Sequence, residues 1–438
     1  MFVKGKRLCL GWFLVLAYLI SGMVGKSYLE YAWQGTWRVH EATAVVLTTA
    51  LVAYLFLRWH QEVDIRQLPR SYRTARSALF AFLGCVIATG LMQEPAAINI
   101  VTSLTYVGMV LVLGIYPQLY FRKIRPERLI DILCLLISLG TLACIIAVLT
   151  GSTFALAAGN RLNGIYNSSI TSARMFNLGC LLLLWRIVRC RRHRKLAVAM
   201  FTLTLIGLVL TKTRTNIACV IVTSGIFLAY VLSHKGRGIE AFIIILALVS
   251  GLVLVLLPGV VDRYQDEVSD IRTFIRLDKT PEEIASNRLP YWNEGLKDID
   301  FGNPLGRGYL AAFGGGSGGF QESGYDRESN RHNMFFSCAQ SYGIIGLCLF
   351  CSFICITLYR FVVGGTPLAA LGLTVLVYTL ITGITGNCLL SFGDPVDRFA
   401  WLLLGICSSC QHSGNLNAER AHNQKGRLGF GTSASKFP

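Results

Sequence analysis

Long apolar runs constrain this chain more than any other feature, because about 20 apolar residues are enough for an α-helix to cross a bilayer. About twelve such runs can be identified, and the last of them is short. They centre on residues 8–24, 42–57, 78–92, 98–120, 129–150, 171–187, 196–211, 214–232, 240–261, 333–359, 368–386 and 399–410. Only 15% of the residues are charged, against about 25% in soluble domains. The sequence therefore predicts an all-α polytopic membrane protein with about 12 transmembrane helices.

The net charge of +17 would indicate nucleic-acid binding in a soluble protein, but in a membrane protein it has a simpler explanation. Basic residues gather in the cytoplasmic loops of membrane proteins. With the N-terminus in the cytoplasm, about 25 of the 41 Lys and Arg residues fall on the cytoplasmic side. The charge therefore predicts a topology with both termini in the cytoplasm, and we expect no nucleic-acid partner.

The polar residues outside the apolar runs predict the domain organisation. Residues 262–332 carry 13 of the 24 acidic residues and none of the 14 cysteines, so they predict a periplasmic loop subdomain without disulfides. The polar segment 413–438 is rich in Gly, Ser and Asn, which predicts a disordered cytoplasmic tail. We expect a transmembrane domain over 1–412 with the loop subdomain inserted between the ninth and tenth helices.

Short helices are expected inside this loop. Pro290 would break a helix interior but is tolerated in a first turn, so a helix is predicted to start near Ser286 or Asn287. This places Arg288 at a helix N-terminus and Trp292 on the apolar face of that helix. The glycine-rich stretch 314–324 lacks the lysine and the strand-loop-helix context of a phosphate-binding P-loop, which favours a hinge or lid.

Basic and polar residues gather where three of the predicted helices begin on the outer side of the membrane. Helix N-termini expose unpaired N–H groups and a positive dipole end, which favours anion binding. The residues near these three ends are Arg161, Asn167, Lys212, Arg214, Arg331, His332 and Asn333, and Arg288 heads the loop helix. This arrangement predicts a site for an anionic, lipid-anchored substrate such as a polyprenyl diphosphate.

The chemistry of these side chains fits a diphosphate leaving group. An arginine fork makes two parallel hydrogen bonds to phosphate oxygens, and fixed cations stabilise the departing charge. His332 can take a proton from an attacking hydroxyl at neutral pH. Arg214 lies in a polar island between two apolar runs, where a charge is costly and indicates function. Arg331 and Arg307 also fit the simpler interpretation of arginines that extend to the lipid headgroups.

Metal binding is not expected. Asp298 and Asp300 resemble a D-x-D metal pair, but side chains two positions apart on a helix point away from each other. The C-x-x-C pairs Cys348/Cys351 and Cys407/Cys410 lie on apolar helices without a matching set of histidines, which favours packing.

Four stretches, taken in order, resemble the O-antigen ligase and polymerase family of bacterial membrane glycosyltransferases. "RLNGIYNSSITSARMF" is similar to its Arg-x-x-Gly segment, although Asn167-Ser168-Ser169 replaces Asn-Pro-Asn. "TKTRTN" resembles its Ser-Arg helix start, with Thr213 in place of serine. "NRLPYW" and "NPLGRGYL" resemble its Arg-x-x-x-Trp helix and Pro-Leu-x-Gly-x-Gly turn, and "RHNMFFSCAQSYGIIGL" its His-Asn helix entry. The resemblance covers about residues 155 to 350.

The resemblance implies a GT-C-like fold and an inverting glycosyltransferase in the bacterial inner membrane that uses no metal, cofactor or nucleotide sugar. Its donor would be a glycan on undecaprenyl diphosphate, transferred to an acceptor hydroxyl on the periplasmic side. Arg214, Arg288 and His332 would be catalytic. Arg161, Asn167, Lys212, Trp292, Arg331 and Asn333 would bind substrate.

Several functions remain open at this point. A polymerase would use a second lipid-linked repeat unit as acceptor, with a chain-length regulator as a further partner, and a ligase would use the lipid A core. "TKTRTN" slightly favours the polymerase. A transporter or flippase would also have about twelve helices, but we identify neither internal symmetry nor a broken helix in the sequence. A receptor or scaffold would not require Arg214 near the membrane.

Overall fold

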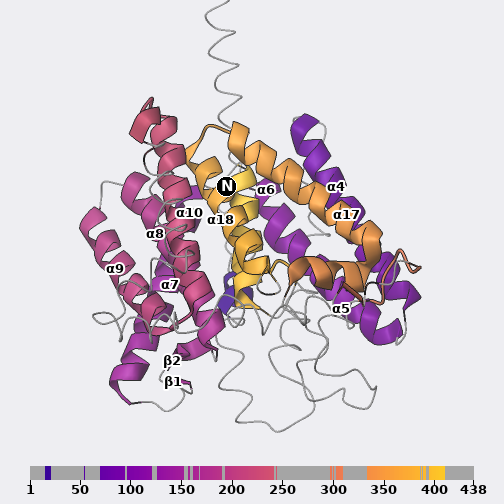
Figure 1. The fold of residues 1–438 in the computed structure, drawn as a ribbon, viewed down its shortest axis with the longest axis horizontal. Coiled ribbons are helices and arrows are strands. Elements are labelled where there is room, and N and C mark those ends of the chain that lie inside the picture. The colour runs from indigo at the N-terminus through magenta and orange to yellow at the C-terminus, as the bar shows by residue number, and fades with distance from the viewer. Residues whose placement is uncertain are drawn as a thin grey trace, which may run out of the picture.

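The structure is a computed structural model (Figure 1). It describes residues 15–20, 54, 70–93, 96–120, 126–151, 156–157, 161–166, 168–189, 193–240, 243, 296–297, 299, 302–308, 333–384, 386, 388–390 and 394–409. Within these ranges, seven helices are long and apolar enough to span a membrane. The prediction of an all-α polytopic membrane protein is therefore confirmed.

The described helices follow the apolar runs closely. They are α4 (Arg70–Met92), α5 (Ala96–Met109), a π-helix (Val110–Ile115), α6 (Tyr116–Tyr120), α7 (Pro126–Leu149), α8 (Ser169–Arg189), α9 (Arg194–Leu210), α10 (Arg214–Ser233), α17 (Met334–Val363) and α18 (Pro367–Ile384). Residues 395–409 form a further helix, which matches the short last run. Three short elements lie between α7 and α8. They are the two-residue strands β1 (Leu156–Ala157) and β2 (Arg161–Leu162) and the 3-10 helix η4 (Gly164–Tyr166).

Other predictions fall on residues that the structure does not describe. The runs at 42–57 and 240–261 lie almost entirely outside the described residues, and only 15–20 of the first run is described. Most of the loop 262–332 also lies outside them, including the predicted helix start near Ser286 and the glycine-rich stretch. The same holds for the tail 413–438. The predicted domain organisation and the total of about 12 helices stay predictions.

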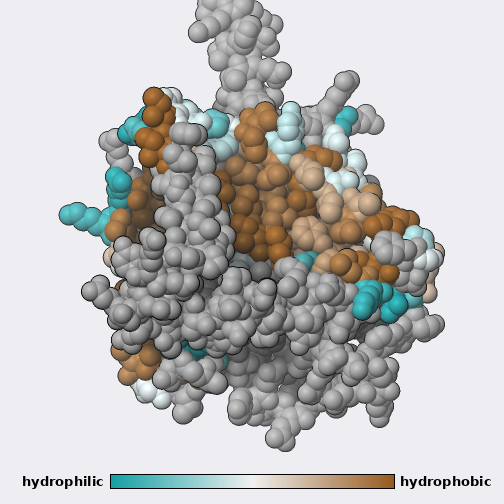
Figure 2. Space-filling model, viewed as in Figure 1, coloured by the Kyte–Doolittle hydropathy of each residue, from teal (hydrophilic) through white to brown (hydrophobic). Residues whose placement is uncertain are grey.

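The helices pack in two groups joined through α18. Helices α7, α8, α9 and α10 form one group, and α4, α5 and α17 form the other (Figure 1). Helix α18 contacts α8 and α10 on one side and α17 on the other. Large apolar side chains such as Leu135, Leu139 and Ile146 on α7 are at least half exposed. Figure 2 shows a broad apolar area over the helices with hydrophilic residues at its margins, as expected for a surface in contact with lipid.

The bundle has two ends, which we name after the topology that the charge pattern predicts. Helices α4, α7, α9 and α18 finish at the outer end, where α5, α8, α10 and α17 begin. The inner end is the opposite one. Arg186 of α8 forms a salt bridge with Asp131 of α7 there. The three helix starts that the sequence analysis connected with anion binding are therefore at one end of the bundle.

Helix α17 is broken at Gly343, and Figure 1 shows its two parts meeting at a sharp bend. Gly343 has φ 67° and ψ −173°, a backbone conformation that is essentially restricted to glycine. A Cβ atom there would lie 2.0 Å from the carbonyl oxygen of Pro304. That oxygen accepts a hydrogen bond from the N–H of Ile345 at 3.3 Å. A loop segment thus replaces the helical partner that the break removes.

The segment 303–308 also forms hydrogen bonds with the part of α17 before the break. The N–H of Arg307 donates to the carbonyl of Gln340, and the N–H of Gly308 to that of Ser341, each at 2.9 Å. These contacts satisfy backbone groups that would otherwise lack partners inside the protein. The sequence analysis identified no broken helix, and this expectation was wrong. The apolar run is uninterrupted in sequence, and the break depends on a segment about 40 residues earlier in the chain.

Candidate active site

The turn between α9 and α10 fixes the backbone of Arg214 at the outer end. The Thr211 hydroxyl lies 2.6 Å from the carbonyl oxygen of Leu208 and 2.8 Å from the Thr213 hydroxyl. Lys212 is half-buried and adopts a left-handed backbone with φ 53°, which is uncommon for a residue other than glycine. Helix α10 then begins at Arg214, as predicted. The side chain of Arg214 lies outside the described part of the structure.

This helix start is tied to α8. The side-chain amide of Asn177 on α8 donates a hydrogen bond of 3.0 Å to the carbonyl oxygen of Asn216, in the first turn of α10. Asn177 is fully buried and Asn216 is 5% exposed. Because a buried amide is costly without a partner, this contact favours one relative placement of the two helix starts.

The start of α17 is equally well defined. The Asn333 side chain caps this helix, since its oxygen accepts hydrogen bonds from the N–H groups of Phe335 (2.9 Å) and Phe336 (3.3 Å). Its amide group donates to the carbonyl oxygen of Ile384 at 3.3 Å, at the end of α18. Asn333 therefore has a structural role, and its predicted contact with substrate stays a prediction. His332 and Arg331 precede this cap and lie outside the described residues.

The Arg161 segment folds back onto α7. Gly164 has φ 56°, and a Cβ atom there would lie 2.2 Å from the Cys144 sulfur. The same sulfur lies 3.4 Å from the N–H of Ile165, which donates to it. Tyr166 is buried, which raises the pKa of its phenol well above the usual range. The glycine three residues after Arg161 is thus required by a close approach, and Arg161 remains half-buried beside it.

A buried arginine that the sequence analysis did not select lies among these helix starts. Arg174 on α8 is 8% exposed, and its guanidinium lies 3.5 Å from a carboxylate oxygen of Asp394. Its carbonyl oxygen accepts a hydrogen bond of 3.0 Å from the Tyr378 hydroxyl of α18. The signal that could have found it is a charged residue inside the apolar run 171–187.

Asp394 also starts the last helix. Its second carboxylate oxygen accepts a hydrogen bond of 2.9 Å from the N–H of Val396, and Pro395 occupies the first helical position, where a missing N–H costs nothing. Arg398, one turn later, is 1% exposed and donates 2.8 Å to the carbonyl of Tyr18, over whose ring it also lies. A cluster of charges therefore lies where this helix begins.

The chain between α18 and this helix is buried although it is not helical. Cys388, Leu389 and Leu390 are fully buried. The carbonyl oxygen of Leu389 accepts hydrogen bonds from the Tyr106 hydroxyl (2.8 Å) and the Trp401 indole (2.9 Å). Burial raises the pKa of the Cys388 thiol to about 12, against the opposing effect of Arg174. Protein side chains thus replace water around this irregular segment.

Together these contacts connect the outer ends of four helices. Asn177–Asn216 joins α8 to α10, Arg174–Tyr378 joins α8 to α18, and Asn333–Ile384 joins α18 to α17. Of the predicted site residues, the structure describes Arg161, Lys212, Asn333 and the backbone of Arg214. Arg288, Trp292 and Asn167 lie outside the described residues, as do Arg331 and His332.

The arrangement favours an anion. The N-terminus of α10 directs unpaired N–H groups to the outer end, and the described residues adjoining it are basic or polar. Among the described residues, no group of three His, Cys, Asp or Glu side chains could hold a metal ion. Asp298 and Asp300 lie outside them. We therefore assign anion binding at the candidate site to cationic side chains and helix N-termini.

Comparison with family models matches one part of the chain. Residues 197–351 match the family model described as O-Antigen ligase. The matched segment runs from α9 into α17 and contains Lys212, Arg214, Arg288, Trp292, Arg331, His332 and Asn333, whereas Arg161 and Asn167 precede it. A comparison with curated proteins found no match. The predicted resemblance to the O-antigen ligase/polymerase family is confirmed over residues 197–351.

Proposed function

We propose that this protein is an inverting glycosyltransferase that moves a glycan from undecaprenyl diphosphate to an acceptor hydroxyl on the periplasmic side of the bacterial inner membrane. The observation that carries the proposal is that the family match falls on the helix starts at Arg214 and Asn333, which converge through α8 and α18. A site at the membrane boundary suits a donor whose lipid part stays in the bilayer.

In the proposed reaction, Arg214 and Arg288 bind the diphosphate. His332 takes the proton of the acceptor hydroxyl, whose oxygen attacks the anomeric carbon from the side opposite the diphosphate. The new C–O bond forms as the bond to the diphosphate oxygen breaks, and the leaving group departs with the electron pair. Fixed cations stabilise this charge without a metal ion. Arg161, Asn167, Lys212, Trp292, Arg331 and Asn333 would position the two substrates.

The acceptor distinguishes two activities within this proposal. A polymerase adds the chain to a second lipid-linked repeat unit, and a ligase adds it to the lipid A core. We favour the polymerase on the "TKTRTN" stretch. A purified protein supplied with an undecaprenyl diphosphate oligosaccharide, with and without lipid A core, tests both. Longer lipid-linked chains identify a polymerase, and glycan on the core identifies a ligase.

The catalytic role of histidine is tested in the same assay in metal-free buffer. We expect His332→Ala to lower the rate by about 10²- to 10⁴-fold, since this is the usual contribution of a general base. His193→Asn is the control, because His193 is exposed at the inner end and asparagine tolerates its left-handed backbone. Product formation by His332→Ala at the wild-type rate would refute the role of His332.

A second candidate function is a flippase for the lipid-linked glycan. The break in α17 favours it, because carriers often contain discontinuous helices with irregular backbone at the transport site. If the purified protein forms no glycosidic product with either acceptor but moves the lipid-linked oligosaccharide across liposome membranes, this candidate replaces the transferase.

A further inference from the structure

The break in α17 is held by two other parts of the chain. The last carbonyl groups before a helix break have no partner inside their own helix. The carbonyls of Gln340 and Ser341 accept hydrogen bonds from N–H groups of residues 303–308, which we call the bridging segment. The carbonyl of Tyr342 accepts one of 3.8 Å from the Cys85 thiol of α4. These three carbonyls therefore have partners outside α17, as backbone groups inside a membrane protein require.

The bridging segment lies directly on the break and has a defined shape of its own. A Cβ atom at Gly306 would lie 2.4 Å from the backbone nitrogen of Gly343. The Asn303 amide donates a hydrogen bond of 2.7 Å to the carbonyl oxygen of Gly306. The Asn303 side-chain oxygen accepts one of 3.3 Å from the N–H of Leu305. The break therefore has the contacts of a fixed corner.

One hydroxyl connects the bridging segment to α4. Thr89 is fully buried, and its hydroxyl oxygen lies 3.1 Å from the carbonyl oxygen of Leu305. It also lies 2.8 Å from the carbonyl oxygen of Cys85 in its own helix, so its one proton is shared between two acceptors. Phe82, on the same face of α4, packs edge-on against the Tyr342 ring with the centroids 5.6 Å apart. This face of α4 thus holds both the bridging segment and the helix before the break.

The first part of α17, residues 334–342, connects the corner to the candidate active site. Its start is capped by Asn333, whose amide donates to the carbonyl oxygen of Ile384 at the end of α18. A helix of this length spans only about 13 Å, and most of its residues are buried. His332 directly precedes Asn333 in the chain. A shift of the corner would therefore be passed along a short, packed helix to the backbone next to His332.

We propose that Thr89 is a positioning residue for the transfer reaction: through the bridging segment it fixes the corner in α17, and with it the placement of His332 relative to the acceptor hydroxyl. This inference rests on the proposed function. Misplacement of a catalytic group by about 1 Å can cost about 100-fold in rate, so a hydroxyl distant from the reacting atoms can set kcat. Arg214 lies on α10, outside this set of contacts, so binding of the donor should change less.

The test compares steady-state kinetics of full-length variants in the transferase assay, with the undecaprenyl diphosphate oligosaccharide as donor and the acceptor that the wild type uses. Thr89→Val removes the hydroxyl and keeps the shape of the side chain. We expect kcat to fall about tenfold or more, with the KM for the donor within about twofold of the wild-type value. Thr89→Ser keeps the hydroxyl, and its kcat should stay within about threefold of the wild-type value.

The matched control is Thr141→Val. Thr141 of α7 is also fully buried, and its hydroxyl donates 2.9 Å to the carbonyl oxygen of Ile137 in its own helix. This variant loses the same kind of local hydrogen bond but no contact with the bridging segment, so it should keep the wild-type kcat. Equal loss of kcat in Thr141→Val or in Thr89→Ser would overturn the proposal. A wild-type kcat in Thr89→Val, or a change confined to KM, would overturn it as well.

Asn303→Ala decides if Thr89→Val does not fold, because it loosens the bridging segment and leaves α4 unchanged. It should lower kcat in the same selective way, and an unchanged kcat would overturn the proposal. The wild type separates this inference from the proposed function. If it forms no glycosidic product, the proposed function falls and the inference falls with it. If it is active and Thr89→Val matches it, only the inference falls.

Discussion

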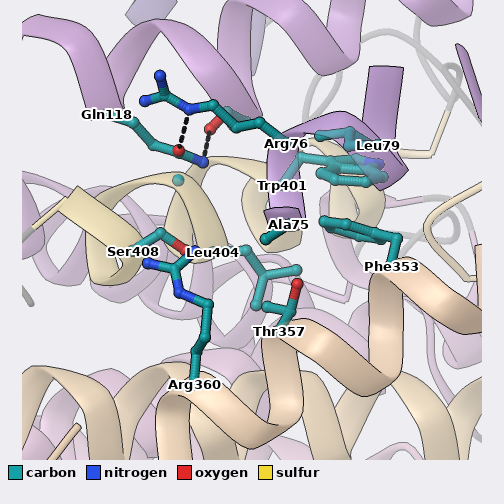
Figure 3. Close-up of a pocket in the computed structure, with 12 residues that line it drawn as sticks. Ala75, Arg76, Leu79, Gln118, Phe353, Thr357, Arg360, Trp401, Leu404 and Ser408 are labelled. Carbon is teal, nitrogen blue, oxygen red and sulfur yellow. Dashed lines mark hydrogen bonds between the residues drawn. The ribbon is translucent and has the colours of Figure 1, made fainter. Parts of the chain in front are cut away.

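Arg174 at the outer end of the bundle and Arg76 at the inner end are both buried, but their side chains have different partners. At the outer end, Arg174 lies 3.5 Å from Asp394, so the protein supplies the counter-charge itself. At the inner end, Arg76 donates a hydrogen bond of 3.2 Å to the neutral side chain of Gln118 (Figure 3). Because a buried cation is costly unless it is paired and hydrogen-bonded, a carboxylate supports the arginine at the outer end, and a neutral amide is among the groups that support Arg76 at the inner end.

The backbone differs between the two ends as well. The outer end contains the break at Gly343, the inserted segment Asn303–Gly308 and the buried loop over 388–390. At the inner end, the described backbone around Arg76 and Gln118 is helical, and it includes the π-helix. Irregular backbone inside a membrane protein has to be satisfied by other protein groups, which is costly and is found mainly where function requires it. The comparison therefore supports the outer end as the location of the proposed chemistry.

The largest effect is expected from Gly343→Ala. Alanine would need the rare backbone conformation of Gly343, and its Cβ would lie 2.0 Å from the Pro304 carbonyl oxygen. We expect the free energy of unfolding to fall by about 3 kcal/mol or more, from backbone strain and overpacking together. Unfolding by denaturant in detergent measures this. The control is Gly84→Ala in α4, where a Cβ would meet nothing within 4 Å and alanine should be neutral or stabilising.

The second prediction removes the counter-charge at the outer end. Asp394→Ala should lower the free energy of unfolding by about 3 kcal/mol, because it leaves Arg174 buried without this carboxylate and removes a helix cap. Asp394→Asn keeps a capping oxygen and should cost less, which separates the charge from the cap. If Asp394→Ala unfolds like the wild type in the same denaturant titration, the pair does not stabilise the outer end.

Much of this fold could be predicted from the apolar runs. The start of α10 at Arg214 and of α17 beside Asn333 follow from the positions where polar residues meet apolar ones. Both boundaries arise from local chemistry, because the bilayer requires backbone hydrogen bonds within the segment. Local patterns were therefore sufficient for the ends of helices, and they brought Arg161, Lys212, Asn333 and the backbone of Arg214 to one end.

Contacts distant in sequence could not be predicted in this way. Gly343 lies in an uninterrupted apolar run, and only Pro304 and its neighbours explain the break there. Arg174 is paired with a residue 220 positions later in the chain, so no local spacing links it to Asp394. The Arg76–Gln118 contact at the inner end likewise joins residues 42 positions apart in the chain. One-dimensional patterns contain no information on such pairings unless another rule, such as the cost of a buried charge, points to them.

The third prediction tests the inner end of the bundle. Thr357→Val replaces a buried hydroxyl, which has no hydrogen-bond partner among the described residues, by a methyl group of similar size. Because no described hydrogen bond is lost, the free energy of unfolding should stay the same or rise by up to about 1 kcal/mol. Denaturant titration in detergent measures this. A loss of more than about 1 kcal/mol would mean that Thr357 has a structural partner.

A fourth prediction concerns the pH dependence of the outer loop. Burial raises the pKa of the Cys388 thiol to about 12, whereas an unfolded chain ionises its thiols near pH 8.5. The folded protein therefore holds this proton longer than the unfolded one, so the contribution of Cys388 is fully present below about pH 8.5 and is lost as the pH rises toward 12. Between pH 7 and pH 10 the free energy of unfolding should fall by about 1 to 2 kcal/mol more in the wild type than in Cys388→Ala. Denaturant titrations at the two pH values measure this difference. Equal slopes would show that the loop opens to water, in which case the outer end is less tightly packed than the contacts of Leu389 with Tyr106 and Trp401 imply.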